Sequence, residues 1–198
     1  MKTKLLMLLV LLGSLWTSNL YAQTRYPKRE FRGAWIQCVN GQFQGMPTEK
    51  MKKVLVSQLD NLQKAGINAI IFQVRAEADA LYKSPYEPWS RFLTGVQGKA
   101  PSPMWDPLQF MIEECHKRNM ELHAWINPYR AKTKGTGALS PMHPYSKNPE
   151  LFVQYAGQLY FDPGLPESRK YICKIVRDIV TRYDVDAIHM DDYFYPYP

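Results

Sequence analysis

The stretch Ile67-Asn-Ala-Ile-Ile-Phe-Gln-Val74 decides the fold, because it is short, almost wholly apolar and rich in β-branched residues. Such a run is typical of a parallel strand that is buried on both faces. It follows residues 48–65, where apolar side chains recur at helical spacing: Met51, Val54, Leu55, Leu59 and Leu62. We expect Thr48 to cap this helix and Gly66 to end it. A helix joined to a buried strand by a short link predicts an α/β protein.

The same alternation extends outward from this strand. Further strands are predicted over residues 31–39, 120–126 and 185–191, and further helices begin at Asp106 and Pro166. Asp106 is a capping acid followed by a proline in the first turn. Two long loops, residues 75–105 and 128–165, both follow strands, whereas each link from helix to strand is short. Long loops on one face of a β/α protein place its binding surface there.

This order of elements is (βα)3β, and two architectures fit it. One is the first portion of a partial (β/α)8 TIM barrel, with long loops after the second and third strands. The other is a complete four-stranded α/β sheet, because a whole barrel typically takes about 250 residues and this chain has 198. No glycine-rich phosphate loop follows the first strand, and polar residues recur at the strand ends as they do in a barrel. We therefore favour the partial barrel.

Residues 1–22 have the order of a secretory signal peptide. Lys2 and Lys4 precede an apolar run over residues 5–12, and Leu20-Tyr21-Ala22 offers a small-residue cleavage site. The run is too short to span a membrane. We expect removal of this leader, export of the mature chain to the periplasm or the cell exterior, and no remaining membrane span. Residues 23–29 then form a linker, and residues 30–198 form the N-terminal half of a barrel.

The net charge of +7 does not by itself indicate a nucleic-acid partner. The basic residues are scattered along predicted helix surfaces rather than gathered in a track, and two lysines leave with the leader. Three cysteines, Cys38, Cys115 and Cys173, cannot all pair internally and lack metal-ligand spacing. We interpret them as small buried hydrophobes. We expect neither a cofactor nor nucleic-acid binding.

Polar and aromatic side chains gather at the C-terminal end of every predicted strand. Residues of one parity share a face of a strand, and those on the shared faces are Trp35, Gln37, Gln73, Arg75, His123, Trp125, Asn127, His189, Asp191 and Tyr193. Tyr129 and Arg130 come directly after the third strand. A single residue of this kind is more often part of a core, but four strands in agreement predict a binding site.

These residue types favour carbohydrate chemistry. Aromatic rings stack on sugar faces, amide and basic groups bond hydroxyls, and carboxylates supply the nucleophile and proton donor that cleave a glycosidic bond. Asp191 is the candidate nucleophile, and we expect Arg75 and His189 to keep it ionised. Asp192 has the opposite parity, so a catalytic role is about as well supported as a loop cap or a salt bridge.

Three further acids lie in the predicted loops. Glu77 and Asp79 follow the second strand, where they either hold the long loop in place or reach the substrate. Asp162, in Tyr160-Phe-Asp-Pro-Gly164, is interpreted mainly as a turn residue.

Six segments give the chain a resemblance to a known family. They are Phe31-Arg-Gly-Ala-Trp35, Asn68-Ala-Ile-Ile-Phe-Gln-Val-Arg75, Ala78-Asp-Ala-Leu-Tyr82, Trp105-Asp-Pro-Leu108, His123-Ala-Trp-Ile-Asn-Pro-Tyr-Arg130 and His189-Met-Asp-Asp-Tyr-Phe-Tyr-Pro196. The chain resembles the bacterial glycosyl hydrolase-like family 10, a group of secreted β/α-barrel proteins, over nearly all of residues 30–196. The resemblance implies that the partner is a glycan and that the activity of the family includes peptidoglycan strands.

That family is distantly similar to α-amylase-type barrels. Asp186-Ala-Ile-His-Met-Asp191 is similar to their fourth-strand Asp-Gly-Phe-Arg-x-Asp, which implies that Asp191 is the nucleophile, with His189 in place of the arginine. Asn127 similarly matches the asparagine after their third strand. In those barrels the proton donor comes from the fifth strand and another carboxylate from the seventh. The chain therefore resembles the front half of a family member.

Three functional hypotheses follow. The first is a retaining two-carboxylate glycoside hydrolase acting on bacterial cell-wall polysaccharide, with the isolated chain inactive because it lacks the proton donor. The second is glycan binding without catalysis. The third is a metal-dependent hydrolase that uses His123, His189, Asp191 and Asp192 as ligands. It is disfavoured because the first strand lacks the His-x-His of metal-dependent barrels, and we assign no metal.

Overall fold

The computed structural model describes residues 30–191. The expected leader, the linker, Asp192 and Tyr193 lie outside the described residues. The chain divides into two compact units at Phe31, and the unit that starts at Arg32 carries all the elements described below. Within residues 30–191, no helix is both long and apolar enough to cross a membrane.

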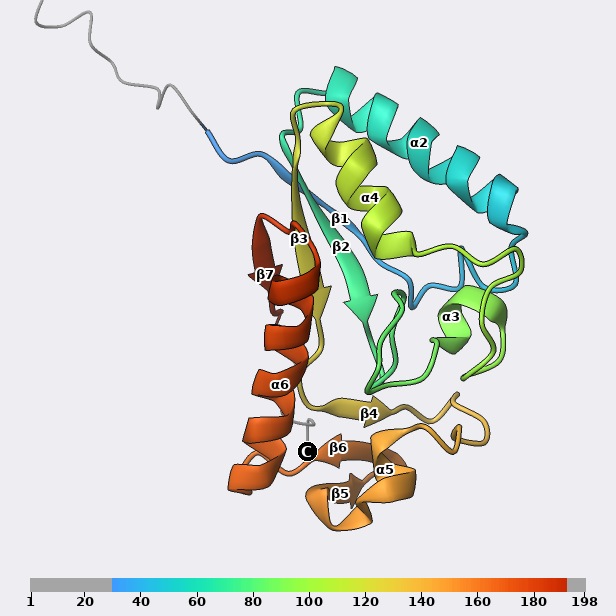
Figure 1. Cartoon of the computed structure of the whole chain (residues 1–198), viewed down its shortest axis with the longest axis vertical. Helices are drawn as coiled ribbons and strands as arrows, with labels where there is room; N and C mark the ends of the chain where they lie inside the picture. Colours follow the sequence, from blue (N-terminus) through green and yellow to red (C-terminus); the bar gives the residue numbers. More distant parts are fainter. Residues whose placement is uncertain (1–29, 192–198) are drawn as a thin grey trace, which may run out of the picture. The chain divides into compact units, whose positions relative to one another are not determined.

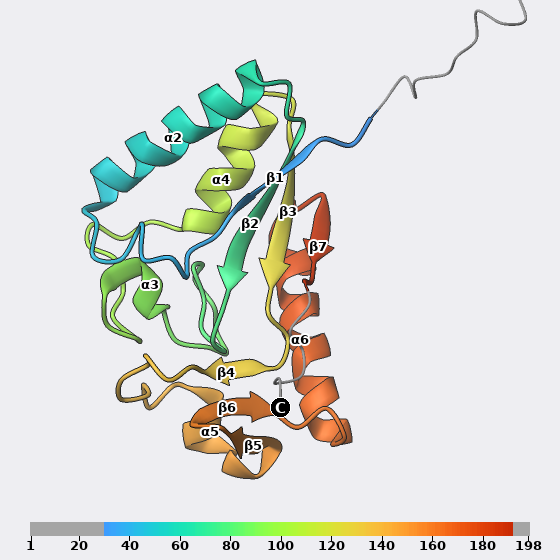
Figure 2. The same ribbon diagram turned by 180° about the vertical axis from the view of Figure 1, so that it is seen from behind.

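A four-stranded parallel sheet confirms the predicted (βα)3β order (Figure 1). Its strands are β1 (Gly33–Ile36), β2 (Ala69–Arg75), β3 (Glu121–Ile126) and β7 (Ala187–His189), in the order β1-β2-β3-β7. The connecting helices are α2 (Thr48–Lys64), α4 (Pro107–His116) and α6 (Pro166–Arg182). Figure 2 shows the same sheet from behind, with β1 and β7 as its outer strands. This is the first portion of a β/α barrel.

The hydrophobic core lies between the helices and one face of the sheet. The strands contribute residues of a single parity to it, among them Ile36, Phe72, Leu122, Ala124 and Ile126. The helices contribute their apolar stripes, including Met51, Leu55, Leu59, Leu108, Met111, Ile175 and Ile179. Burying one side chain of this kind stabilises the fold by about 1.5–3 kcal/mol. Strand residues of the opposite parity therefore lie on the other face of the sheet.

The helix ends follow local chemistry, with one exception. Asp106 caps α4 as predicted, because its side chain accepts a hydrogen bond from the backbone N–H of Gln109. The prediction for Thr48 is wrong: Pro47 is the cap residue of α2, and the Thr48 hydroxyl donates instead to the carbonyl of Pro103 at 3.4 Å. Gly66 has a φ of +82°, which lets the chain turn from α2 into β2.

The loop after β3 contains structure that the sequence analysis missed. It holds an antiparallel sheet of β4 (Arg130–Lys132), β6 (Gln158–Phe161) and β5 (Phe152–Tyr155), with α5 (Pro144–Lys147) and a 3-10 turn η1 (Pro149–Leu151). A second small core, formed by Ala78, Ala131, Leu159, Phe161 and Ile172, joins this sheet to the loop after β2 and to α6. Asp162 makes the predicted turn, since its carboxylate accepts from the backbone N–H of Gly164 at 2.8 Å.

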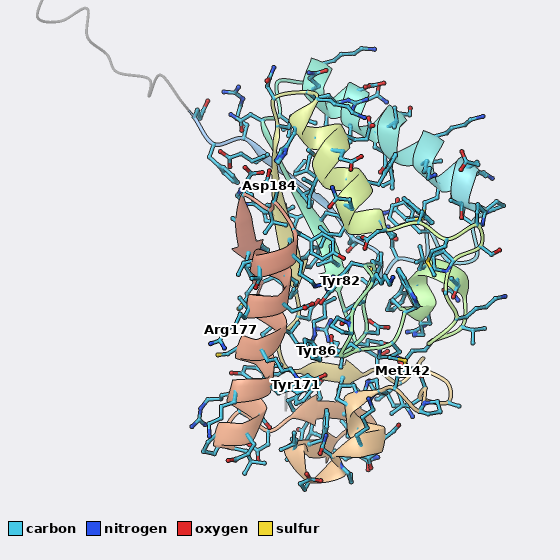
Figure 3. All side chains as sticks on the ribbon, in the orientation of Figure 1. Tyr82, Tyr86, Met142, Tyr171, Arg177 and Asp184 are labelled. Atoms are coloured by element: carbon cyan, nitrogen blue, oxygen red, sulfur yellow. The ribbon has the colours of Figure 1, made fainter. Side chains whose placement is uncertain are left out.

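The loop after β2 includes α3 (Arg91–Thr94) and packs against α6 through tyrosines. Figure 3 shows Tyr82 and Tyr86 of this loop beside α6, which carries Tyr171. The Tyr82 ring meets Tyr183 edge-on at 5.6 Å, and the ammonium of Lys174 lies 3.7 Å above the Tyr86 ring. These contacts fix the long loop to the helix.

The three cysteines do not share one environment. Cys38 and Cys115 are buried, as predicted, but Cys173 is exposed on α6. The prediction for Cys173 was wrong because its position lies off the buried stripe of Ile172, Ile175 and Ile179.

Candidate active site

The face of the sheet opposite the helices carries most of the predicted site residues. In register, Trp35 of β1 aligns with Ile71 of β2 and His123 of β3. One layer further along, Gln73 aligns with Trp125 and then with His189 of β7. Asn127 and Asp191 follow two residues after Trp125 and His189. The side chains are therefore stacked in layers that rise toward the C-terminal ends of the strands.

A chain of hydrogen bonds ends at the carboxylate of Asp191. The backbone N–H of Cys38 donates to Gln73 Oε1 at 3.0 Å, Gln73 Nε2 donates to Asn127 Oδ1 at 2.8 Å, and Asn127 Nδ2 donates to Asp191 Oδ1 at 2.8 Å. A backbone N–H can only donate, so it fixes the orientation of both amides. Asp191 is consequently a hydrogen-bond acceptor, as a carboxylate is.

The row of hydrogen bonds is buried at the Gln73 end and accessible at the Asp191 end. Gln73 and Asn127 are 1% and 3% exposed, whereas Asp191 is partly exposed. Buried amides with both groups satisfied are costly to displace. The structure thus presents one carboxylate from a fixed support.

His189 lies between two indole rings. Trp35 Nε1 donates to His189 Nε2 at 3.3 Å, and the rings meet at 5.9 Å and 72°. The ring of Trp125 meets His189 edge-on at 6.2 Å, and its indole N–H has no acceptor among the described residues. Trp35 is 61% exposed, so its ring is available for stacking on a ligand.

The surroundings of His189 disfavour its protonated form. Burial lowers its pKa below the usual value, and this effect outweighs the opposite effect of the Asp191 carboxylate. The bond from Trp35 also needs an unprotonated Nε2. Both observations weigh against His189 as the positive charge that the sequence analysis expected beside Asp191.

Arg75 does not join this face. Its guanidinium is fully buried and pairs with Glu87 through two bonds, Nε to Oε2 at 2.8 Å and Nη2 to Oε1 at 2.7 Å. The register with β3 shifts between Gln73 and Arg75, but Val74 still packs in the helix-side core with Phe72, so the pairing with Glu87 is what withdraws Arg75 from the site. Arg75 Nη1 instead donates to the carbonyls of Asn127 and Pro128 at 2.6 and 3.1 Å. Arg75 thus positions Asn127 and is not placed to bind a substrate.

The other predicted residues lie around this centre. His123 sits one layer lower, 2.9 Å from Glu121. Gln37 and Trp35 line a cavity of about 590 Å³ beside α2. Tyr129 lines an apolar cavity of about 730 Å³ beside α6. Arg130 lines a further cavity that is described below.

Glu77 and Asp79 are structural within the described residues. The Glu77 carboxylate accepts from Arg91, Thr133 and Thr136, and these bonds outweigh burial and hold its pKa below the usual range. Asp79 is fully buried and accepts from the backbone N–H of Glu77 at 3.1 Å. Burial, aided by the Glu77 charge, raises the pKa of Asp79 to about 6. Both acids therefore hold the loops together. This is the first of the two roles considered for them, the other being contact with the substrate.

Sequence reasoning missed two buried residues that support the site. Glu87 neutralises Arg75, and His143 lies 3.1 Å from the carbonyls of both Glu77 and Ala131. Neither lies in a regular element with a recognisable period, and no local motif marks them.

The remaining questions concern Asp192. Among residues 30–191, no three His, Cys, Asp or Glu side chains come together as a metal site would require. The metal hypothesis also involves Asp192, which lies outside those residues. The predicted substrate-binding residue Tyr193 lies outside them too. Their roles stay predictions.

A parallel β/α sheet with aromatic, amide and carboxylate groups at the C-terminal ends of its strands is typical of a β/α barrel with a candidate active site on that face. The chain belongs to the Glycosyl hydrolase-like 10 family, which matches residues 30–198. It is 49% identical over 175 residues to "Glycosyl hydrolase YngK" of Bacillus subtilis (strain 168), covering 85% of this chain and 34% of that protein. It is 34% identical over 195 residues to "Glycosyl hydrolase DigH" of Escherichia coli (strain K12), covering 88% and 44%. The chain thus spans less than half the length of these relatives.

Solved structures support the fold alone. A noncanonic maltogenic α-amylase, AmyB, from Thermotoga neapolitana has a TM-score of 0.55 at 17% identity, covering 82% of this chain and 39% of that one. An Anoxybacillus α-amylase also has a TM-score of 0.55, at 14% identity, covering 82% and 41%. The partial barrel predicted from the sequence is confirmed.

Proposed function

We propose that this chain carries the nucleophile half of a retaining glycoside hydrolase that acts on bacterial cell-wall glycan. The observation that carries the proposal is the Asn127–Asp191 hydrogen bond, held from the sheet by Gln73 on the same face as Trp35. The family supports a glycan as the partner. The cell-wall substrate and the mechanism are our own inference.

The proposed reaction has two steps. In the first, Asp191 Oδ2 attacks the anomeric carbon while Asn127 Nδ2 holds Oδ1, and the bond from that carbon to the leaving oxygen breaks. The leaving oxygen takes a proton from a general acid. In the second, water attacks the glycosyl ester, the same acid group takes the water's proton, and Asp191 is released. A retaining pair requires the second carboxyl to lie about 5–5.5 Å from Asp191.

The two acids that follow β2 within residues 30–191 are not free to serve as that acid. Glu77 and Asp79 are fully buried and engaged in the loop contacts. This observation favours a second candidate function for the isolated chain, glycan binding without cleavage. Positioned acid catalysis is worth about 10²–10⁴-fold, so we expect binding by this chain and turnover only where a later carboxylate completes the site.

The expected leader supports an exported protein. Its basic start and apolar run place the proposed activity in the periplasm or outside the cell, where cell-wall glycan is accessible.

The test compares this chain with the full-length Bacillus subtilis relative. Changing the relative's aspartate that aligns with Asp191 to asparagine is expected to abolish release of reducing ends from peptidoglycan glycan strands and to leave binding intact. The isolated chain is expected to bind the strands without cleaving them, and Asp191→Asn is expected to change that binding little. Full turnover by the relative after this substitution would disprove the assigned nucleophile.

A further inference from the structure

A polar cavity of about 510 Å³ adjoins the candidate site. Its walls come from the loop after β1, the loop after β2 and the start of β4. Asn40 lines both this cavity and the one beside Trp35 and Gln37. The two cavities therefore meet at Asn40.

The charges of two lining residues cancel. The Glu77 carboxylate takes two bonds from Arg91, at 3.0 and 3.2 Å, and two from the hydroxyls of Thr133 and Thr136, at 2.6 and 2.7 Å. These four donors fill its acceptor sites. Arg91 lies over the Phe92 ring at 4.1 Å, which holds its guanidinium in place. Asp79 lies behind Glu77 and does not line the cavity.

Arg130 is the surplus cation. Its backbone is fixed by pairing with Tyr160 in the antiparallel sheet. Its side chain is partly exposed, lines the cavity and makes no hydrogen bond or ion pair within residues 30–191. Since Glu77 has no acceptor left, Arg130 cannot share it. Arg130 thus presents a guanidinium that is unpaired within residues 30–191, and the amides of Asn40 and Gln44 line the same cavity.

We propose that this cavity is a subsite for an acidic sugar and that Arg130 binds the carboxylate of that sugar. A guanidinium matches a carboxylate through two parallel hydrogen bonds, and a single surplus charge matches a single negative charge. The flanking amides suit the hydroxyls and acetamido group of the same sugar. The proposal rests on glycan binding by the chain and adds a charge preference to it.

The test measures binding of the full chain to four probes by calorimetry. They are a chitin oligosaccharide, the same oligosaccharide O-carboxymethylated, the methyl ester of that product, and a sulfated form. The methyl ester removes only the charge, so it isolates the role of the carboxylate. Arg130→Gln is the variant, and Lys134→Gln, an exposed lysine on the same segment and outside the cavity, is the charge-matched control.

We expect the carboxymethylated probe to bind about 5- to 20-fold more tightly than its ester or the neutral form. Arg130→Gln should abolish this preference, Lys134→Gln should keep it, and added salt should weaken it. Equal binding of the carboxylate and its ester, a preference that survives Arg130→Gln, or tighter binding of the sulfated probe would each overturn the proposal. Binding of none of the probes would instead refute the glycan function itself.

Discussion

The buried ion pair of Arg75 and Glu87 offers a sharp test of how the site is supported. Both side chains are fully buried, and burial together with the Glu87 charge raises the pKa of the nearby Tyr171 hydroxyl. Glu87→Gln keeps the shape but removes the charge and one acceptor. An amide N–H then faces a donor of Arg75, and the guanidinium is left buried without a counter-charge.

Breaking a buried pair from one side typically costs about 3–5 kcal/mol. A domain has about 5–15 kcal/mol of stability in total, so the variant loses a large share of it. With an unfolding slope of about 1–3 kcal/mol per molar urea, the urea midpoint falls by more than about 1 M. The loss does not stop at stability, because Arg75 also holds the carbonyl of Asn127.

The assay is urea unfolding followed by tryptophan fluorescence, with Glu49→Gln as the control. Glu49 forms the exposed pair with Lys52 on α2, so its loss should cost less than about 0.5 kcal/mol. If Glu87→Gln also cost less than about 1 kcal/mol, Arg75 would not depend on its partner. The argument that Arg75 is structural would then fail.

Four further predictions follow from the structure. Asp79→Asn should stabilise the fold by about 1–3 kcal/mol at pH 8 and have no effect near pH 4. The pKa of Asp79 is raised to about 6, so the folded chain loses stability as pH rises through that value, and asparagine avoids this loss. Urea midpoints at both pH values check this, and destabilisation at pH 8 would contradict it. Trp35→Ala should leave the unfolding temperature unchanged, since the ring is 61% exposed, and weaken glycan binding by about tenfold or more; intact binding would remove Trp35 from the site. NMR titration should find the pKa of His189 below 6.5, and lower still in Asp191→Asn, because the carboxylate raises it; a rise in the variant would show that the two groups do not interact. N-terminal sequencing of the exported protein should begin at Gln23, and an intact Met1 on protein kept in the cytoplasm would disprove the leader.

The sheet, the helices and the layered side chains were predictable because each depends on a local period. The apolar run of β2 and the stripe of α2 were visible in sequence, and so was the alternation that brings Asn127 and Asp191 to one place. These features require no knowledge of distant contacts, since the period alone assigns a residue to a face.

The failures have physical causes at particular positions. Arg75 is withdrawn from the site by its buried pairing with Glu87, a partner in an irregular loop that no local period reveals. The short strands β4, β5 and β6 are stabilised by a small core shared with α6, which local patterns do not reveal. Thr48 does not cap α2, and its hydroxyl donates to the carbonyl of Pro103, 55 residues away in the chain.

Asn127 serves two partners, its side chain holding Asp191 and its carbonyl held by Arg75. This sharing has a consequence for engineering the protein. Grafting a foreign loop after β2 would remove Glu87, release Arg75 and cost the Asp191 carboxylate its fixed position, in addition to changing the loop residues that line the polar cavity. Substitutions at Arg130, which is joined to no side chain in the described residues, should alter which glycans bind and leave Asp191 in place. Specificity can therefore be redesigned at Arg130, whereas an exchange of the loop after β2 must keep the buried pair of Arg75 and Glu87.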